Sequence, residues 1–319
     1  YEKIAYIDSI TFKFYPDRPS LVTAYNKENI EGIGNLTPSE QTQIKKNIAI
    51  HDLKLPSYYA IFFNKNNNNI LNEDAVRRAM AQAIDRDRII NEALAGQAVK
   101  ADSPILPNFR GHNPESSKYD YNKQDAENVL HEAGYNEIDT DGYRWKEGNK
   151  LAITLTIPNR EEQLKVAEII KENWKAVGID TTIEALDPVE LQTEYIKPRN
   201  YQALIYGQLM GHDPDPYAFW HSIQRTDPGL NLTSLKDPEI DDLLETARQT
   251  TDEEERVKKY LHFQNVLTEQ IPAIFLYSPI YAYGVSPKVK GLNLQYITYP
   301  SDRFADIENW YINTKRTWN

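Results

Sequence analysis

The chain has 319 residues, with 47 acidic and 36 basic side chains, six histidines and no cysteine. This length is enough for two domains, each with its own hydrophobic core. The net charge of −11 argues against a nucleic-acid partner, and the lack of cysteine excludes disulfides and thiolate metal sites.

The amino-terminal third begins with a predicted strand over residues 4–14, whose apolar residues alternate: Ile4, Tyr6, Ile10, Phe12 and Phe14. A short helix is predicted within residues 19–29. Gly32-Ile33-Gly34 lacks the third glycine of a dinucleotide fingerprint and has no clear strand before it. It favours a turn, and we expect no cofactor.

Helix signals follow the apolar run Tyr58–Phe63 and an Asn-rich loop. Asn72 is the predicted cap of a helix with one apolar face, formed by Val76, Ala79, Met80, Ala83 and Ile84. Asp85 and Asn122 are predicted caps of two further helices, at residues 86–94 and 123–133.

The middle of the chain predicts a strand–helix–strand unit. Leu151, Ile153, Leu155 and Ile157 alternate, and so do residues 179–185. Between them, Asn159 and Glu162 have the spacing of a capping box at the start of a helix. Two strands joined by a helix in this way are parallel.

The remaining predicted elements are a helix from Asp187 to Ile196, the strand Tyr201–Tyr206, helices over 237–248 and 251–269, and the strand Ala273–Tyr277. The rest of the chain lacks a regular pattern and is predicted to be irregular. The order of elements predicts an α/β fold in which one lobe is made of two separated segments.

The stretch Gly207–Trp220 follows a predicted strand, and ligands of open α/β sheets bind outside the carboxyl ends of strands. Such a loop, with backbone donors and an anion, could hold an extended peptide and its amino terminus. The alternative is a connection made of turn residues. Both interpretations are compatible with the residues alone.

Four potential metal ligands lie close together in this stretch: His212, Asp213, Asp215 and His221. Their spacing matches no recognised metal motif, and both aspartates precede proline, as is common in turns. We therefore expect turn residues and no metal. No nucleophile–base pair is visible, so the sequence predicts a protein that is not an enzyme.

Several segments together resemble the family 5 extracellular solute-binding proteins, which are the dipeptide-, oligopeptide- and nickel-binding receptors of ABC importers. The matching segments occur in order along nearly the whole chain: Tyr59–Asn64, Asp74–Ala79, Ala83–Arg86, Ile89–Ile90, Gly96–Ala98, Pro104, Tyr121–Asn122, Ala126, Leu130, Glu132–Tyr135, Val166–Glu168, Trp174–Ile179, Asp213–Pro216, His221–Ser222, Asn231, Asp237–Asp241 and Pro272–Tyr277.

The resemblance implies a periplasmic-binding-protein-like type II fold, with two lobes and a hinge. Lobe I would comprise residues 1–54 and 276–319, and lobe II would comprise residues 55–275. Full members of the family are longer, so we expect this chain to be a carboxyl-terminal portion in which lobe I is incomplete at its amino terminus. A lipid anchor would then lie outside this chain.

The function implied by the resemblance is capture of a peptide by a monomeric extracytoplasmic receptor, which delivers it to an ABC permease in the membrane. In peptide-binding relatives, the loop after the equivalent of Tyr201–Tyr206 pairs with the peptide backbone, which implies that role for Gln208, Leu209, Met210 and Gly211. The aspartate that binds the peptide amine aligns with His212, with Asp213 one residue further on. The alternatives are a nickel-chelate receptor and a sensory protein that kept the fold.

Overall fold

The computed structural model describes residues 5–116 and 118–312 and divides into two compact units. The smaller unit comprises residues 1–56 and 279–319, and the larger comprises residues 57–278. No helix among the described residues combines the length and the apolar character that crossing a membrane requires.

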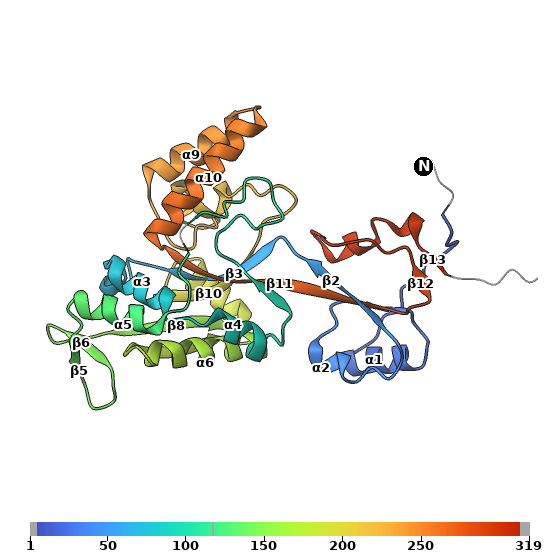
Figure 1. The fold of residues 1–319 in the computed structure, drawn as a ribbon, viewed down its shortest axis with the longest axis horizontal. Helices are drawn as coiled ribbons and strands as arrows, with labels where there is room; N and C mark the ends of the chain where they lie inside the picture. The colour runs from blue at the N-terminus through green and yellow to red at the C-terminus, as the bar shows by residue number, and fades with distance from the viewer. Residues whose placement is uncertain (1–4, 117, 313–319) are drawn as a thin grey trace, which may run out of the picture. The chain divides into compact units, whose positions relative to one another are not determined.

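The larger unit is built on a run of five neighbouring strands within an eight-stranded sheet of mixed direction (Figure 1). Its strand order is β11 (Ala273–Val285), β3 (Ser57–Phe63), β10 (Ala203–Leu209), β8 (Ala152–Pro158) and β9 (Asp180–Leu186). Strand β3 is antiparallel to both of its neighbours, whereas β10, β8 and β9 are parallel to one another. The predicted strand–helix–strand unit is confirmed as β8, α6 (Glu161–Lys175) and β9.

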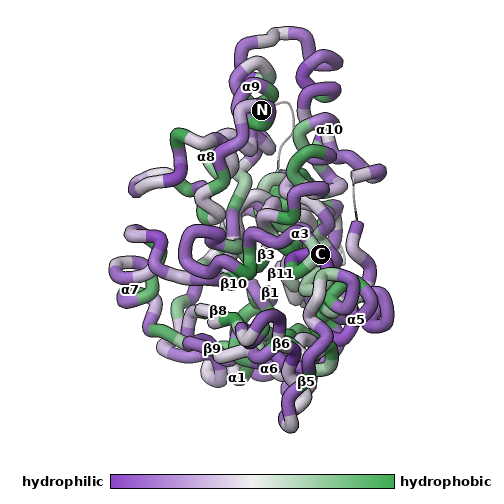
Figure 2. Tube along the Cα trace, turned by 90° about the vertical axis from the view of Figure 1, so that its left-hand side faces the viewer, coloured by the Kyte–Doolittle hydropathy of each residue, from purple (hydrophilic) through white to green (hydrophobic). Residues whose placement is uncertain are grey.

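Two hydrophobic clusters cover the two faces of this sheet, because successive residues of a strand point to opposite sides. Ile61 and Phe63 of β3 join the cluster formed with α3 (Asp74–Gln82), α5 (Lys123–Glu132) and α6. Tyr58 and Phe62 join the cluster formed with α9 (Pro238–Gln249) and α10 (Glu253–Gln270). Figure 2 shows that the outer turns of α9 and α10 are mostly hydrophilic.

The larger unit also contains shorter elements: η1 (Asn69–Asn72), α4 (Arg86–Arg88), η2 (Ile89–Ala93), β4 (Ala98–Lys100), β5 (Glu137–Ile138), β6 (Arg144–Lys146), β7 (Asn149–Lys150), α7 (Pro188–Glu190), η3 (Leu191–Ile196), α8 (Tyr217–Trp220) and η4 (Ser222–Gln224). Strands β5, β6 and β7 form a separate antiparallel sheet. Strand β4 pairs with β11.

The smaller unit pairs the second half of β11 with β1 (Gly32–Ile33) and β2 (Ala49–Lys54). Its other elements are α1 (Arg18–Asn26), α2 (Pro38–Gln41), β12 (Val289–Lys290), η5 (Pro300–Phe304), η6 (Ile307–Asn309) and β13 (Tyr311–Ile312). Arg18 donates from Nε to Glu40 at 2.6 Å and also binds the carbonyl oxygens of Gly34 and Asn35. This network ties α1 to α2.

Several local predictions were wrong. No strand forms within residues 5–14, because no strand of the described chain pairs with this segment. Phe12 and Phe14 are exposed, and Ile4 lies outside the described residues. Gly32 and Ile33 form β1 instead of a turn, and β11 continues to Val285 instead of ending at Tyr277.

Two predicted helix caps were also wrong. Asn72 ends the 3-10 helix η1, and Glu73 is the residue that precedes α3. The backbone N–H of Asn159 donates to the carbonyl oxygen of Leu186 at 2.7 Å, which continues the pairing of β8 with β9. Helix α6 therefore starts one residue later, after Arg160, and no side chain caps it. The predicted caps Asp85 and Asn122 are confirmed, and Asp187 caps the helix that was predicted to begin there.

Candidate functional site

One edge of the large sheet gathers the carboxyl ends of three parallel strands. Strand β8 ends at Pro158, β9 at Leu186 and β10 at Leu209, and β3 begins opposite Leu209 at Ser57. Ligands of open α/β sheets bind at edges of this kind. Helix α6 starts at the same edge, because it follows β8 after only two residues.

The last part of β10 has a strand partner on only one side. Its pairing with β3 continues from Ala203 to Leu209, whereas its pairing with β8 stops at Leu204. The backbone of residues 205–209 therefore presents an edge to which β8 does not pair. An unpaired strand edge of this kind can accept an extended peptide as an additional strand.

The predicted site residues Gln208, Leu209 and Met210 differ in their surroundings. Gln208 and Leu209 belong to β10 and not to a loop, because the ladder with β3 extends through both. The buried Gln208 accepts a hydrogen bond from the Tyr58 hydroxyl group and donates to the carbonyl oxygen of Leu230 at 3.3 Å. Leu209 is 48% exposed, whereas Met210 is 7% exposed and packs in the hydrophobic cluster with α9 and α10.

Gly211, His212 and Asp213 form the turn that follows. Gly211 has a φ angle of +80° with open space around the position of a Cβ atom, so backbone conformation explains the glycine here. His212 is exposed. Both carboxylate oxygens of Asp213 accept from Nη2 of Arg256, at 2.9 and 2.8 Å, and this hydrogen bonding raises the pKa of Arg256.

The rest of this loop is fastened to helices α9 and α10 by charged contacts. Asp215 accepts from Nε of Arg248 at 2.6 Å, and the Arg248 guanidinium lies 3.8 Å from the ring centre of Tyr217. Nε2 of the buried His221 lies 2.9 Å from a carboxylate oxygen of Glu245. Asp213, Asp215 and His221 therefore each have a different partner. Across residues 5–116 and 118–312, no group of three or more His, Asp or Glu side chains could hold a metal ion.

Tyr59 and Tyr277 also lie at this edge, which the sequence did not predict. Their rings stack with centroids 5.0 Å apart, and the ring of Tyr59 lies over Gly207 in the opposite strand. A Cβ atom at Gly207 would lie 3.0 Å from Cζ of Tyr59, so glycine allows the ring to lie this close and a larger residue would make it shift by a few tenths of an ångström. The alternation of β3 and β11 could have indicated which face these tyrosines share, but not that the two rings meet.

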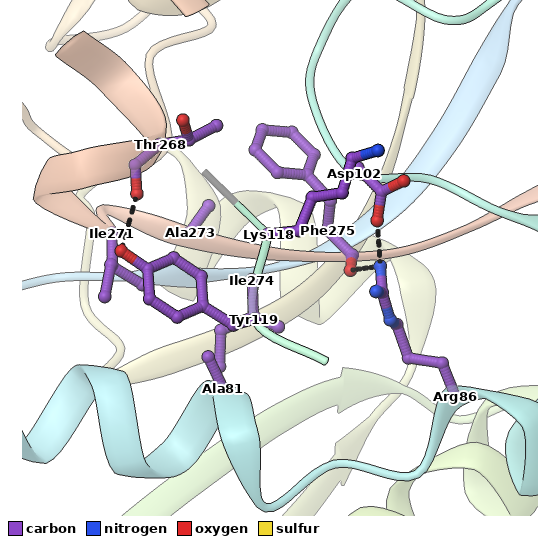
Figure 3. Close-up of a pocket in the computed structure, with 10 residues that line it drawn as sticks. All are labelled: Ala81, Arg86, Asp102, Lys118, Tyr119, Thr268, Ile271, Ala273, Ile274 and Phe275. Carbon is purple, nitrogen blue, oxygen red and sulfur yellow. Dashed lines mark hydrogen bonds and ion pairs between the residues drawn. The ribbon is translucent and has the colours of Figure 1, made fainter. Parts of the chain in front are cut away.

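A small cavity in the larger unit lies beside the buried Arg86 (Figure 3). Its volume of about 30 Å³ is enough for a water molecule but not for a peptide. Arg86 donates to the carbonyl oxygen of Ala101 at 2.8 Å and to Asp102 at 2.7 Å. The Tyr119 hydroxyl group donates to the carbonyl oxygen of Thr268 at 3.3 Å. These contacts join separate chain segments, and they explain the polar residues around the cavity.

Residues 1–230 match the family of bacterial extracellular solute-binding proteins, family 5 Middle. The chain belongs to this family. It is a family of solute-binding proteins, not of enzymes, and the α/β architecture described above is the periplasmic-binding-protein-like fold of its relatives. These findings confirm the family and the fold class that the sequence predicted.

Among the relatives, the oligopeptide-binding protein AppA of Bacillus subtilis is 28% identical over 320 residues, covering 98% of this chain and 57% of the relative. Its structure in complex with a nonapeptide has a TM-score of 0.76 at 26% identity, covering 94% of this chain and 59% of that chain. The nickel-binding periplasmic protein of Escherichia coli is 26% identical, covering 76% of this chain and 49% of the relative. The chain thus spans about half to three fifths of the length of these relatives.

Proposed function

We propose that this chain is part of the substrate-binding component of an ABC importer and captures peptides for a membrane permease. The observation that carries the proposal is the free edge of β10 over residues 205–209, at the carboxyl ends of the parallel strands. The similarity to an oligopeptide-binding protein over nearly the whole chain supports it. A peptide laid along this edge would gain backbone hydrogen bonds without a constraint on its sequence.

The individual site residues take different parts in this proposal. Leu209 is exposed at the end of β10 and Gly211 is open to its surroundings, so both can approach a peptide backbone. Gln208 and Met210 are buried, so only their backbones are available to the ligand. His212 and Asp213 follow within reach of the same end of the strand.

We assign lobe I of the receptor to residues 1–54 and 276–319, and lobe II to residues 55–275. The division of the chain into compact units after residues 56 and 278 supports this assignment. The receptor works as a monomer outside the cytoplasm, in the periplasm or at the cell surface through a lipid anchor, and releases peptide to its permease. Closure of two lobes on a ligand is the motion that such receptors use.

Calorimetry tests the proposal. The full-length protein that contains this chain is titrated with peptide pools ranging from dipeptides to nonapeptides. Saturable heat with at least one pool is expected, and no binding across all lengths would refute peptide capture. A permease mutant of the source organism that still takes up the bound peptide at the normal rate would refute the transport role.

The second candidate is a receptor for a nickel chelate, because a nickel-binding protein is among the relatives and His212 is exposed in the candidate loop. Equilibrium dialysis with nickel and free histidine distinguishes the two. Retention of nickel together with failure to bind any peptide pool would favour the chelate. Retention that survives His212→Ala would show that this histidine is not the ligand.

A further inference from the structure

A half-buried carboxylate, Glu184, lies close to the point where the free edge of β10 begins. Leu204 is the last residue of β10 that pairs with β8, and its partner there is Thr156. Strand β8 stays paired with β9 beyond this point, and in that ladder Thr156 lies opposite Glu184. Residues opposite one another in neighbouring strands point to the same face of the sheet, so these three side chains share a face.

Two hydroxyl groups hold this carboxylate in place without neutralising its charge. The fully buried Thr156 donates to one oxygen of Glu184 at 3.1 Å, and the Tyr195 hydroxyl group donates to the other at 2.9 Å. Glu184 has no ion-pair partner within residues 5–116 and 118–312. An ionised carboxylate offers about four acceptor sites, so two hydroxyl groups leave room for a donor from a ligand.

The free segment of β10 contacts the same helix as Glu184. The Tyr206 hydroxyl group, in the free segment, donates to Oε1 of Gln192 at 3.5 Å. Gln192 and Tyr195 both belong to η3, so this helix contacts β10 through one residue and Glu184 through the other. Neighbouring strands lie about 4.8 Å apart, so a peptide paired with the free edge would lie nearer to Glu184 than β10 does. The carboxylate is then within reach of a long side chain of that peptide.

The charge of Glu184 is more available than that of the aspartate in the loop after β10. Both oxygens of Asp213 already share a guanidinium nitrogen of Arg256. An incoming ammonium group would meet a neutral pair at Asp213 and an uncompensated negative charge at Glu184. The pKa of Tyr195 is raised by its hydrogen bond to Glu184, and further by the negative charges of Glu184 and Glu190. The surroundings of this carboxylate therefore favour a cation.

We propose that Glu184 selects peptides that carry a lysine or arginine side chain next to the start of the free edge. The ammonium or guanidinium group donates charge-assisted hydrogen bonds to the carboxylate, and the Tyr206 oxygen can accept another. The backbone of a paired peptide lies in the plane of the sheet, so a side chain reaches this face more readily than the amino terminus does. This inference rests on the proposed function and names the class of peptide that the site prefers.

Variation of the peptide tests which group is recognised. The full-length protein is titrated with alanine-based peptides of the length that binds tightest in the calorimetry of peptide pools. One position at a time is replaced by lysine, by glutamate, or by norleucine, which is apolar and uncharged. At one position, lysine should bind about tenfold or more tighter than norleucine, which is the size of a charge-assisted hydrogen bond, and glutamate should bind more weakly. N-acetylated peptides should keep this preference, because the amino terminus is not the group recognised.

Matched variants of the protein test the residue. Glu184→Gln keeps an acceptor for the buried Thr156 and should abolish the lysine preference. Glu190→Gln removes an equal charge from the exposed helix α7 and should keep the preference, as should Tyr195→Phe, which removes a hydrogen bond but no charge. A lysine preference that is equal in wild type and Glu184→Gln refutes the inference while leaving peptide capture intact. No binding of any peptide by wild type refutes the proposed function itself.

Discussion

The loop after β10 and the start of α6 both lie at the carboxyl edge of the large sheet. Their carboxylates differ in whether they have ion-pair partners. The loop after β10 is fastened to α9 and α10, with Asp213 on Arg256 and Asp215 on Arg248. Within residues 5–116 and 118–312, Glu162 at the start of α6 has no ion-pair partner, and no side chain caps this helix. Proximity to a binding edge therefore does not make a carboxylate a ligand anchor, because the partners it already has decide what it can still bind.

The two segments are also held in place by different forces. The loop depends on exposed and half-exposed ion pairs, which typically contribute less than about 1 kcal/mol each. Helix α6 is anchored by its apolar face, in which Trp174 is fully buried and donates from Nε1 to the carbonyl oxygen of Met80 at 2.9 Å. The position of Glu162 should accordingly be more rigid than that of Asp213.

Removing the anchor of α6 should have the largest effect. Trp174→Ala deletes a large buried side chain and one hydrogen bond, so we expect a loss of about 3–5 kcal/mol in the free energy of unfolding. Urea unfolding followed by circular dichroism measures it. Trp174→Phe, which keeps most of the volume, should lose clearly less. If both variants unfold like wild type, packing does not anchor this helix.

A change under the aromatic pair should have the next largest effect. Gly207→Ala places a Cβ atom 3.0 Å from Cζ of Tyr59, so the ring must shift by a few tenths of an ångström while it is held on its other side by Tyr277. Overpacking of this kind typically costs about 1–3 kcal/mol. The double variant Gly207→Ala with Tyr59→Ala should show less than the sum of the two single effects. Additive losses would indicate that the ring does not press on this glycine.

The third change leaves the loop after β10 with an unpaired carboxylate, as Glu162 is at the start of α6. Arg256→Met leaves the carboxylate of Asp213 without its partner, so peptides with a free amino terminus should bind about tenfold tighter than to wild type. Their N-acetylated forms should be unaffected. Lys259→Met is the matched control, since it removes a positive charge one turn further along α10. Equal gains in both variants would point to a general effect of net charge.

The sequence predicted the elements of this edge better than the contacts at it. The regular alternation around Leu155 and the apolar face of α6 predicted parallel strands and a buried helix, and both are confirmed, because burial periodicity is a local property. The end of β10 was predicted three residues too early, since pairing with Ser57 and Tyr58 is non-local. The pair of Asp213 with Arg256 spans 43 residues, and no spacing rule predicts it.

The smallest expected effect contrasts the two carboxylates directly. Burial raises the pKa of Glu162 in the folded protein above its ordinary value of 4.5, so the ionised carboxylate is disfavoured there. The contribution of Glu162 to stability therefore falls as the pH rises from below 4.5 through the raised pKa. Glu162→Gln should therefore leave the protein equally or slightly more stable at neutral pH. Asp213→Asn, which weakens an ion pair, should lower the free energy of unfolding by up to about 1 kcal/mol. Urea titrations of both variants at neutral pH measure the difference. If the free energy of unfolding falls as much in Glu162→Gln as in Asp213→Asn, then Glu162 also has a stabilising partner in the folded protein.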